Sequence, residues 1–274
     1  MMGYYSQQFL QGWEIDRMDG PKRTILVTGA ASGIGRATVE RLRAQSHRVI
    51  GVDLQGAEID ADLGNPEGRA QMIARARELA PQGLDGVLAG AGVGNPDRPR
   101  EIVAVNHFGA VATLEGLRPL LACGHRPRAV VISSTSAFMP FDSELVDLCL
   151  AGDEPAALAR VMEDPGRAYP SSKQALSRWL RRASVRPEWA GAGILLNGVA
   201  PGLIETPMSA RLLHDPHWAE VIHQGNPRAL EGYGAPDDVA ELLAYLLCFE
   251  GRWMLGQIIY IDGGNDALSR SGQV

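Results

Sequence analysis

Cysteine is scarce in this 274-residue chain. Its three cysteines (Cys123, Cys149 and Cys248) lie far apart and form no Cys-x-x-Cys pair. An odd number of widely spaced cysteines argues against a disulfide framework and against a structural zinc site, and is typical of a reducing compartment. We therefore expect a cytoplasmic protein that binds no metal.

A block of basic residues is also missing. The chain has 26 lysine and arginine residues against 32 acidic residues, which gives a formal net charge of -6. Nucleic acids and anionic membranes attract basic patches and stripes, and none stands out along this sequence. Neither is therefore an expected partner.

Long apolar runs are absent as well. The longest uncharged stretch, Trp189–Ile204, contains Asn197, Pro201 and several glycines, so it does not predict a membrane span. Residues 1–22 have no apolar core and carry acidic side chains, so we do not expect a secretory signal peptide. This N-terminal extension is compatible with a leader, a cloning remnant or an arm that docks on a neighbour.

The chain does contain apolar strands that alternate with longer helical segments. With 45% hydrophobic and 21% charged residues, it can bury a large core, and residues 23–274 suit one α/β domain. Aliphatic strands separated by helices predict a doubly wound parallel sheet covered on both faces. The predicted strands are Thr24–Thr28, Arg48–Val52, Glu58–Asp60, Gly86–Ala89, Ala129–Ser133, Ile194–Val199 and Gln257–Ile261. The predicted helices are Gly35–Ala44, Pro66–Ala80, Glu101–Leu121, Ser171–Ser184 and Pro236–Phe249.

Two segments interrupt this alternation. Residues 142–167 lie where a few loop residues would suffice, and their apolar spacing predicts one or two short amphipathic helices. Residues 202–234 are rich in histidine, proline and glycine and predict a long surface excursion. Both follow the carboxyl ends of strands, where α/β sheets bind ligands, so we expect both near a binding site.

A glycine-rich turn follows the first strand, with the sequence TGAASGIG at residues 28–35. Gly29 permits a tight turn, Gly33 lets a pyrophosphate approach the backbone, and Gly35 lets the next helix press on the strand. The free N–H groups at the helix N-terminus then favour phosphate. The pattern indicates a dinucleotide site, although an ordinary strand-to-helix turn would also accommodate these glycines.

Asp53 closes the second predicted strand. A carboxylate at this position accepts hydrogen bonds from the adenosine ribose hydroxyls and repels a 2′-phosphate. Ser32 in the turn is not basic, and the nearby Arg36 and Arg48 do not outweigh a strand-end acid. The pattern therefore favours NAD over NADP; the alternative is that Asp53 only caps a turn or helix.

Tyr169 and Lys173 stand four residues apart at the start of a predicted helix. This spacing places both side chains on one helix face. A tyrosine of ordinary pKa is a poor base at neutral pH, but a nearby ammonium group and the positive ring of an oxidised nicotinamide both favour the phenolate. The pair therefore predicts a general acid/base whose pKa is lowered toward neutrality.

Together these motifs resemble the short-chain dehydrogenase/reductase family, over roughly residues 23–266. The family's fold, a seven-stranded Rossmann-type sheet, is therefore the expected fold. The resemblance rests on motifs that occur in the family's order: Thr28–Gly35, Asp62-Leu63, Ala89–Gly92, Val105-Asn106, Ile132–Ser134, Tyr169–Lys173, Asn197–Pro207 and Ile261–Gly264. One departure is Ala89-Gly90-Ala91-Gly92, where the family often has Asn-Asn-Ala-Gly, and we expect looser local hydrogen bonding there.

The resemblance implies four catalytic residues. Tyr169 would be the general acid/base, and Lys173 would hold the nicotinamide ribose and lower the pKa of Tyr169. Ser134, rather than its neighbour Ser133, would bond the substrate oxygen, and Asn106 would anchor a water in the proton relay. Read without the family, Ser134 is a strand-end cap and Asn106 a buried polar residue satisfied by backbone.

The resemblance also implies the lining of an NAD site. Asp62 and Leu63 would border the adenine, and Thr206 would meet the nicotinamide carboxamide. The full set of expected cofactor-binding residues is Gly29, Ser32, Gly33, Ile34, Gly35, Asp53, Asp62, Leu63, Ala91, Gly92, Tyr169, Lys173, Pro201, Gly202, Ile204 and Thr206.

Residues 142–167 are an insertion relative to typical family members. The insertion resembles that of bacterial 3α-hydroxysteroid dehydrogenase/carbonyl reductases and coniferyl-alcohol dehydrogenases, which implies a hydrophobic alcohol or carbonyl substrate. The alternative function is a catalytically idle dinucleotide-binding sensor or scaffold. Because the insertion enters the helix of Tyr169, which commonly lies in a subunit contact of the family, we expect a homo-oligomer that is a dimer rather than a tetramer.

Histidines gather in residues 202–234, the segment expected to form a lid over the substrate. His214, His217 and His223 invite a metal-site interpretation. An Asp-Pro pair between the first two breaks the helix that would align them, and no independent ligand motif accompanies them. A metal site is therefore not predicted.

Overall fold

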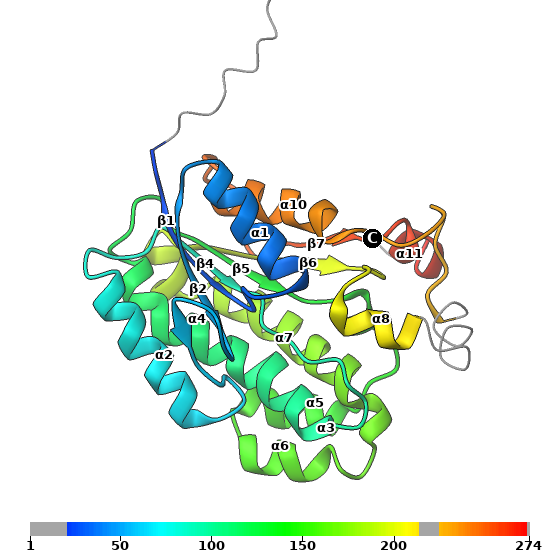
Figure 1. Cartoon of the computed structure of the whole chain (residues 1–274). Helices are drawn as coiled ribbons and strands as arrows, with labels where there is room; N and C mark the ends of the chain where they lie inside the picture. Colours follow the sequence, from blue (N-terminus) through cyan, green and yellow to red (C-terminus); the bar gives the residue numbers. More distant parts are fainter. Residues whose placement is uncertain (1–20, 214–224, 273–274) are drawn as a thin grey trace, which may run out of the picture.

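A computed structural model describes residues 21–213 and 225–272 of the chain. Seven parallel strands form one sheet in the order β3-β2-β1-β4-β5-β6-β7, with helices on both sides (Figure 1). The fold is therefore the predicted Rossmann-type doubly wound sheet, and each strand lies within two residues of its predicted bounds. The strands are β1 Thr24–Thr28, β2 Arg48–Asp53, β3 Ile59–Asp60, β4 Gly86–Ala89, β5 Arg128–Ile132, β6 Leu195–Pro201 and β7 Ile258–Ile261.

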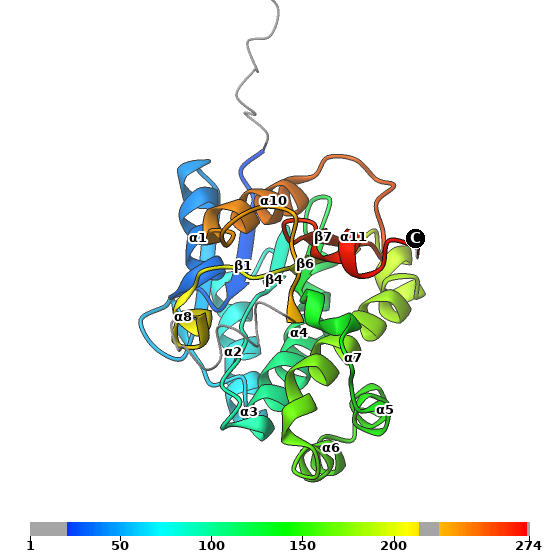
Figure 2. The same ribbon diagram turned by 90° about the vertical axis from the view of Figure 1, so that its right-hand side faces the viewer.

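Two apolar layers cover the sheet because neighbouring residues of a strand point to opposite faces. Leu26 of β1 packs in the layer built with α2, α4 and α7, whereas Ile25 and Val27 pack in the layer built with α1 and α10. Figure 2 shows these helices on the two sides of the sheet. The helices are α1 Gly33–Ala44, α2 Pro66–Leu79, α3 Pro99–Val103, α4 Ala110–Leu121, α5 Ser143–Ala151, α6 Glu154–Arg160, α7 Ala168–Ser184, α8 Pro207–Leu213, α10 Pro236–Cys248 and α11 Asn265–Ser269.

The helix predicted for Glu101–Leu121 is interrupted. The chain forms α3, then a π-helical segment, η1, at Ala104–Gly109, and then α4. A Cβ on Gly109 would lie 2.9 Å from the carbonyl oxygen of Leu63, so the glycine lets this segment press on the loop after β3. The hydrophobic period alone does not show a π-helical turn, which commonly occurs at functional sites.

The insertion folds as α5 and α6, as its apolar spacing predicted. Asp142 caps α5 by accepting the N–H groups of Glu144 and Leu145, and Asp153 caps α6 by accepting that of Ala156. The apolar side of α5 packs with η1 and α7 in a third hydrophobic cluster, which lies outside the two layers of the sheet (Figure 1). The insertion therefore covers one side of the helix that carries Tyr169.

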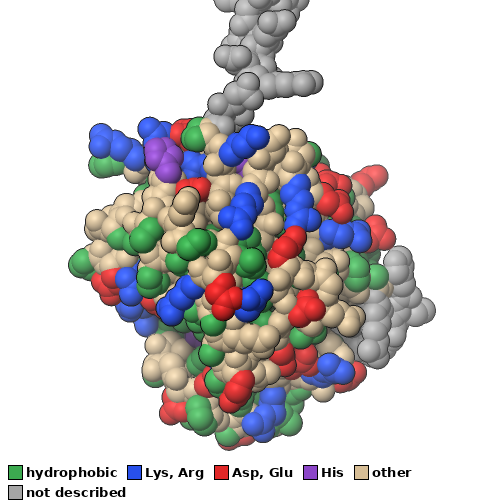
Figure 3. All heavy atoms as spheres, turned by 60° about the vertical axis from the view of Figure 1, so that its left-hand side comes forward, with side chains coloured by type: hydrophobic (Ala, Val, Ile, Leu, Met, Phe, Trp, Pro, Cys, Tyr) green, Lys and Arg blue, Asp and Glu red, His purple; other side chains and the backbone are tan. Residues whose placement is uncertain are grey.

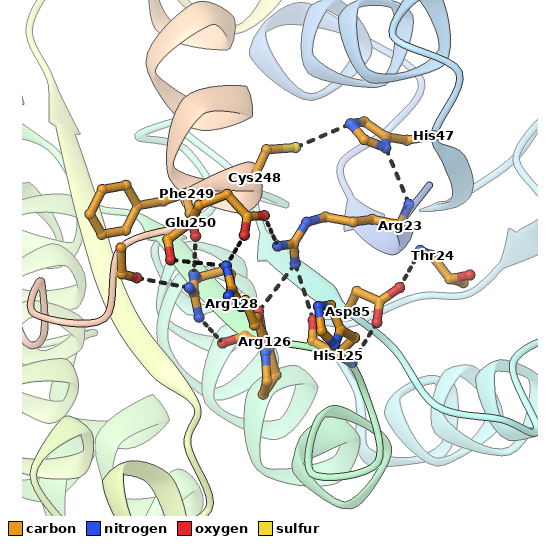
Figure 4. Close-up of polar contacts among 12 residues, drawn as sticks. Arg23, Thr24, His47, Asp85, His125, Arg126, Arg128, Cys248, Phe249 and Glu250 are labelled. Atoms are coloured by element: carbon orange, nitrogen blue, oxygen red, sulfur yellow. Dashed lines mark hydrogen bonds and ion pairs between the residues drawn. The ribbon is translucent and has the colours of Figure 1, made fainter. Parts of the chain in front are cut away.

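A polar network closes the amino ends of the central strands (Figure 4). The buried guanidinium of Arg23 donates to the carbonyl oxygens of His125 and Arg126, at 3.2 and 3.1 Å, and pairs with Glu250 at 2.9 Å. Arg128 of β5 donates to the carbonyl oxygen of Phe249 at 2.8 Å. The amino edge of the sheet is thus tied to the end of α10.

The surface carries charged side chains of both signs (Figure 3). On the face drawn in Figure 3, basic and acidic side chains are interspersed, without a basic stripe. Among the described residues, no helix is long and apolar enough to cross a membrane. All three cysteines are free. The N-terminal extension lies, up to residue 20, outside the described residues.

His107 of η1 predicts acid-sensitive stability. It is 1% exposed, its Nε2 lies 2.9 Å from the carbonyl oxygen of Cys149, and burial lowers its pKa to about 4. Below pH 6.5 the unfolded chain binds a proton that the folded chain takes up only near pH 4. Acidification across this window should therefore lower the free energy of unfolding by up to about 3 kcal/mol.

Urea unfolding of the wild type and of His107→Gln at pH 7.0 and 4.5 measures this effect. We expect the variant to lose about 2 to 3 kcal/mol less on acidification than the wild type, because glutamine does not titrate. Equal losses would show that His107 does not carry the effect.

Candidate active site

A cavity of about 650 Å³ opens at the carboxyl ends of the strands and extends from Asp53 to Tyr169. Every residue expected to bind the cofactor lines it, and so does Ser134. Parallel strands end at one edge of a sheet, which brings loops far apart in sequence to the same place. Asn106 is fully buried and lies behind the cavity wall.

The glycine-rich turn has no room for side chains. A Cβ on Gly35 would lie 1.9 Å from the carbonyl oxygen of Gly29, so only glycine lets α1 begin this close to β1. Gly29 and Gly33 have φ angles of 76° and 51°, which favour glycine. Ser32, the N-cap of α1, makes no side-chain hydrogen bond to the helix amides. The turn therefore fits a pyrophosphate at the N-terminus of a helix.

Asp53 is half-buried, and its carboxylate is held by backbone. Its Oδ2 accepts the N–H of Ala31 at 2.9 Å, and its Oδ1 accepts that of Leu54 at 2.7 Å. Asp53 thus caps a turn, as the alternative interpretation proposed. The same two hydrogen bonds also hold its carboxylate at the cavity wall. Each oxygen keeps a further lone pair that can accept a ribose hydroxyl.

The arginines weighed against Asp53 have other partners. Arg36 pairs with Glu40 at 3.6 Å, and Arg48 donates to the carbonyl oxygen of Leu79 at 2.6 Å. Both are described residues, and neither lines the cavity. The electrostatics at this end therefore suit a ribose without a 2′-phosphate.

The turn after β4 departs from the family sequence but is firmly bonded. The hydroxyl of Thr28 accepts the N–H groups of Gly90 and Ala91, at 3.0 and 3.1 Å. The looser hydrogen bonding expected from the lost asparagines is therefore offset by a threonine of the neighbouring strand. The expectation missed this contact because it joins β1 to β4 only after the sheet forms.

Tyr169 and Lys173 lie one turn apart on α7, and the ammonium nitrogen is 5.7 Å from the centre of the tyrosine ring. Lys173 is 4% exposed and donates to the carbonyl oxygen of Ile132 at 2.8 Å. Ser134 follows β5 and accepts the N–H of Ser136 at 3.1 Å. Its neighbour Ser133 lies 2.7 Å from the hydroxyl of Ser177, so Ser134 is the serine on the tyrosine side.

The pKa of Tyr169 departs from the sequence-based expectation. Burial raises it, and a side-chain hydrogen bond with Ser134 opposes that rise. Burial also lowers the pKa of Lys173 to about 8, so the ammonium form still predominates at neutral pH. Desolvation of the phenol therefore outweighs the hydrogen bond with Ser134, and the lowering expected from Lys173 and an oxidised nicotinamide stays a prediction.

The side chain of Asn106 is occupied by backbone. Its Oδ1 accepts the N–H of Val93 at 2.8 Å, and its Nδ2 donates to the carbonyl oxygen of Val93 at 2.9 Å. Nδ2 also contacts the hydroxyl of Ser172 at 3.4 Å. The interpretation as a buried, backbone-satisfied residue thus describes its side chain, which joins η1, α7 and the loop after β4.

The sequence analysis did not identify several residues that line the cavity. The wall beyond Tyr169 is formed by Val93, Gly94, Met139 and Met208, with one acid, Glu101. They come from four separate segments and carry no motif, so only the folded chain identifies them. Of the expected lid, α8 is described, whereas His214, His217 and His223 lie outside the described residues. The described residues contain no cluster of side chains that could hold a metal.

Two family models match the chain. The model described as short chain dehydrogenase matches residues 23–146, and that described as Enoyl-(Acyl carrier protein) reductase matches residues 156–266. The gap between them falls inside the 142–167 insertion.

Relatives and solved structures match nearly the whole chain. The 3-alpha-hydroxysteroid dehydrogenase/carbonyl reductase of Comamonas testosteroni is 37% identical over 256 residues, which covers 91% of this chain and 98% of that protein. The coniferyl-alcohol dehydrogenase of a Pseudomonas species is 28% identical, covering 88% and 96%. The 3-alpha-hydroxysteroid dehydrogenase from Pseudomonas sp. B-0831, crystallised with NADH, gives a TM-score of 0.86 at 39% identity, covering 92% and 100%.

Proposed function

The chain belongs to the short-chain dehydrogenase/reductase family, and on that premise we propose that it is an NAD-dependent enzyme for hydrophobic alcohols and the matching carbonyl compounds. One observation carries the proposal. A single cavity joins Asp53, at the end expected to hold adenosine, to Tyr169, Lys173 and Ser134. A hydroxysteroid or an aryl alcohol is the substrate class favoured by the names of the relatives.

The cofactor would be held along the whole sheet edge. The amides at the start of α1 suit the pyrophosphate, Asp53 the adenosine ribose, and Lys173 and Thr206 the nicotinamide end. A bound nicotinamide would supply the hydride acceptor for the carbinol carbon or, when reduced, the hydride donor for the carbonyl carbon. The protein contributes by positioning the two reacting carbons, because holding them face to face makes the reaction effectively unimolecular.

The proton moves at the hydroxyl of Tyr169. Its raised pKa keeps the phenol protonated at neutral pH, which suits donation to a carbonyl oxygen during reduction. In the oxidation direction the phenol must lose its proton, so the rate should rise with pH. Ser134 would steady the substrate oxygen, and Asn106 would position the loop at Val93.

The substrate end supports an apolar ligand. Val93, Met139 and Met208 line it beside the acid Glu101, and methionine adapts its shape to different hydrophobic surfaces. The 142–167 insertion lies beside this end and contributes Gly166 to the cavity wall.

We place the protein in the cytoplasm, which the three free cysteines support.

Replacement of Tyr169 by phenylalanine should lower kcat by about 10² to 10⁴, because the proton loses its acceptor and donor. The Kd for NADH, measured by cofactor fluorescence, should change little. Tyr245→Phe is the matched control, since Tyr245 is 54% exposed on α10. Retained turnover in Tyr169→Phe would refute the acid/base role. NADH binding without turnover of any steroid or aryl alcohol would favour the idle sensor instead.

Replacement of Asp53 by alanine should narrow the preference for NADH over NADPH by about tenfold in Kd, because the charge that repels a 2′-phosphate is lost. Fluorescence titration with both cofactors measures the ratio. Glu188→Ala removes an exposed acid elsewhere and should leave the ratio unchanged. A wild type that prefers NADPH would contradict the NAD assignment.

The insertion also bears on assembly. Leu145 and Cys149 of α5 pack in one cluster with Ala168 and Ala175 of α7, so this side of α7 is already covered. We expect a homodimer built through another face. Light scattering of the intact protein should give twice the chain mass. A tetramer whose contacts use α7 would contradict this expectation.

A further inference from the structure

Arg69 lies outside the cofactor cavity yet bonds two segments that shape it. It lies on the first turn of α2, and its side chain is 8% exposed. Nε donates to the carbonyl oxygen of Leu63 at 2.7 Å, and Nη2 donates to that of Ala104 at 3.1 Å. Leu63 lines the cavity, and Ala104 begins η1, two residues before Asn106. One guanidinium therefore fixes the distance between the loop at Leu63 and the start of η1 at Ala104.

The loop at Leu63 has little freedom to move independently. A Cβ on Gly68 of α2 would lie 2.0 Å from the carbonyl oxygen of Asp62, and one on Gly109 of η1 would lie 2.9 Å from that of Leu63. The loop is thus pressed between two helical segments. A shift of either segment must displace the cavity wall, since close-packed groups transmit strain.

A glutamate of the insertion makes the buried arginine possible. The two carboxylate oxygens of Glu154 each accept one N–H group of Arg69 at 2.7 Å, and the pair is 8% and 20% exposed. A buried guanidinium without a partner is strongly disfavoured. His107 supplies a second tie, to the carbonyl oxygen of Cys149 in α5. The insertion therefore contacts η1 and its anchor at two separate points.

We propose that Arg69, neutralised by Glu154, is a positioning residue for the cofactor site and couples the insertion to the adenine-side wall. This inference rests on the proposed NAD function. In this arrangement the insertion does more than border the substrate: it completes the support that holds Leu63 at a fixed distance from the segment of Asn106. Such indirect supports typically change affinity by roughly two- to thirtyfold.

Three variants separate positioning from stability. Arg69→Lys keeps a cation beside Glu154 but cannot reach two carbonyl oxygens and a carboxylate at once. Arg69→Met combined with Glu154→Leu replaces the pair by apolar groups, which commonly preserves or raises stability. Glu163→Gln is the control, because it removes an exposed acid of the same insertion, one that pairs with Arg160.

We expect both Arg69 variants to raise the Kd for NADH and the KM for NAD by roughly two- to thirtyfold, with kcat changed by less. Without cofactor, hydrogen exchange at residues 62–64 and 104–106 should speed up in both. The double variant should nevertheless unfold at a temperature near that of the wild type. Glu163→Gln should match the wild type throughout.

A stably folded double variant with wild-type NADH affinity and wild-type exchange would overturn the inference, because Arg69 would then serve stability alone. If Arg69→Lys fails to fold, the double variant decides. A wild type that binds no NADH would instead overturn the NAD assignment, on which the inference rests.

Discussion

The contact between Gly35 and the carbonyl oxygen of Gly29 determines where the first helix begins, because a Cβ at Gly35 would lie 1.9 Å from that oxygen. The helix can then start directly above β1, in the middle of the sheet. Its free amides, the carboxylate of Asp53 and the turn after β4 all meet at this edge. The Thr28 hydroxyl bonds that turn, so β1 and β4 also share the support of the cavity.

Buried polar side chains lie at both ends of the cavity, but in different surroundings. At the catalytic end burial raises the pKa of Tyr169 and lowers that of Lys173 to about 8. At the adenine end Arg69 is also buried, and the carboxylate of Glu154 lies 2.7 Å from its guanidinium. Both ends depend on residues brought together by α7, η1 and the insertion, which pack in one cluster.

Local patterns predicted the sheet well because most of its strands have an aliphatic centre and are separated by turn residues and helices. They predicted the glycine turn and the Tyr169–Lys173 pair because those features depend on spacing within one element. The Glu101–Leu121 segment is helical as predicted, but local patterns did not show its π-helical turn at Ala104–Gly109, which lies against the loop of Leu63. The burial that raises the pKa of Tyr169 could not be inferred from spacing, because desolvation depends on what surrounds a side chain.

The sequence by itself determined which local features occur and in what order along the chain. These are a glycine turn after the first strand, an acid at the end of the second, and a tyrosine and a lysine on one helix face. Those features follow from backbone sterics and helical period, which act over a few residues. Only the tertiary structure decided that the side chain of Asn106 bonds the backbone of Val93. It also decided that Arg69 bonds Leu63, Ala104 and Glu154. These bonds join residues far apart in sequence, and their geometry exists only once the layers have packed.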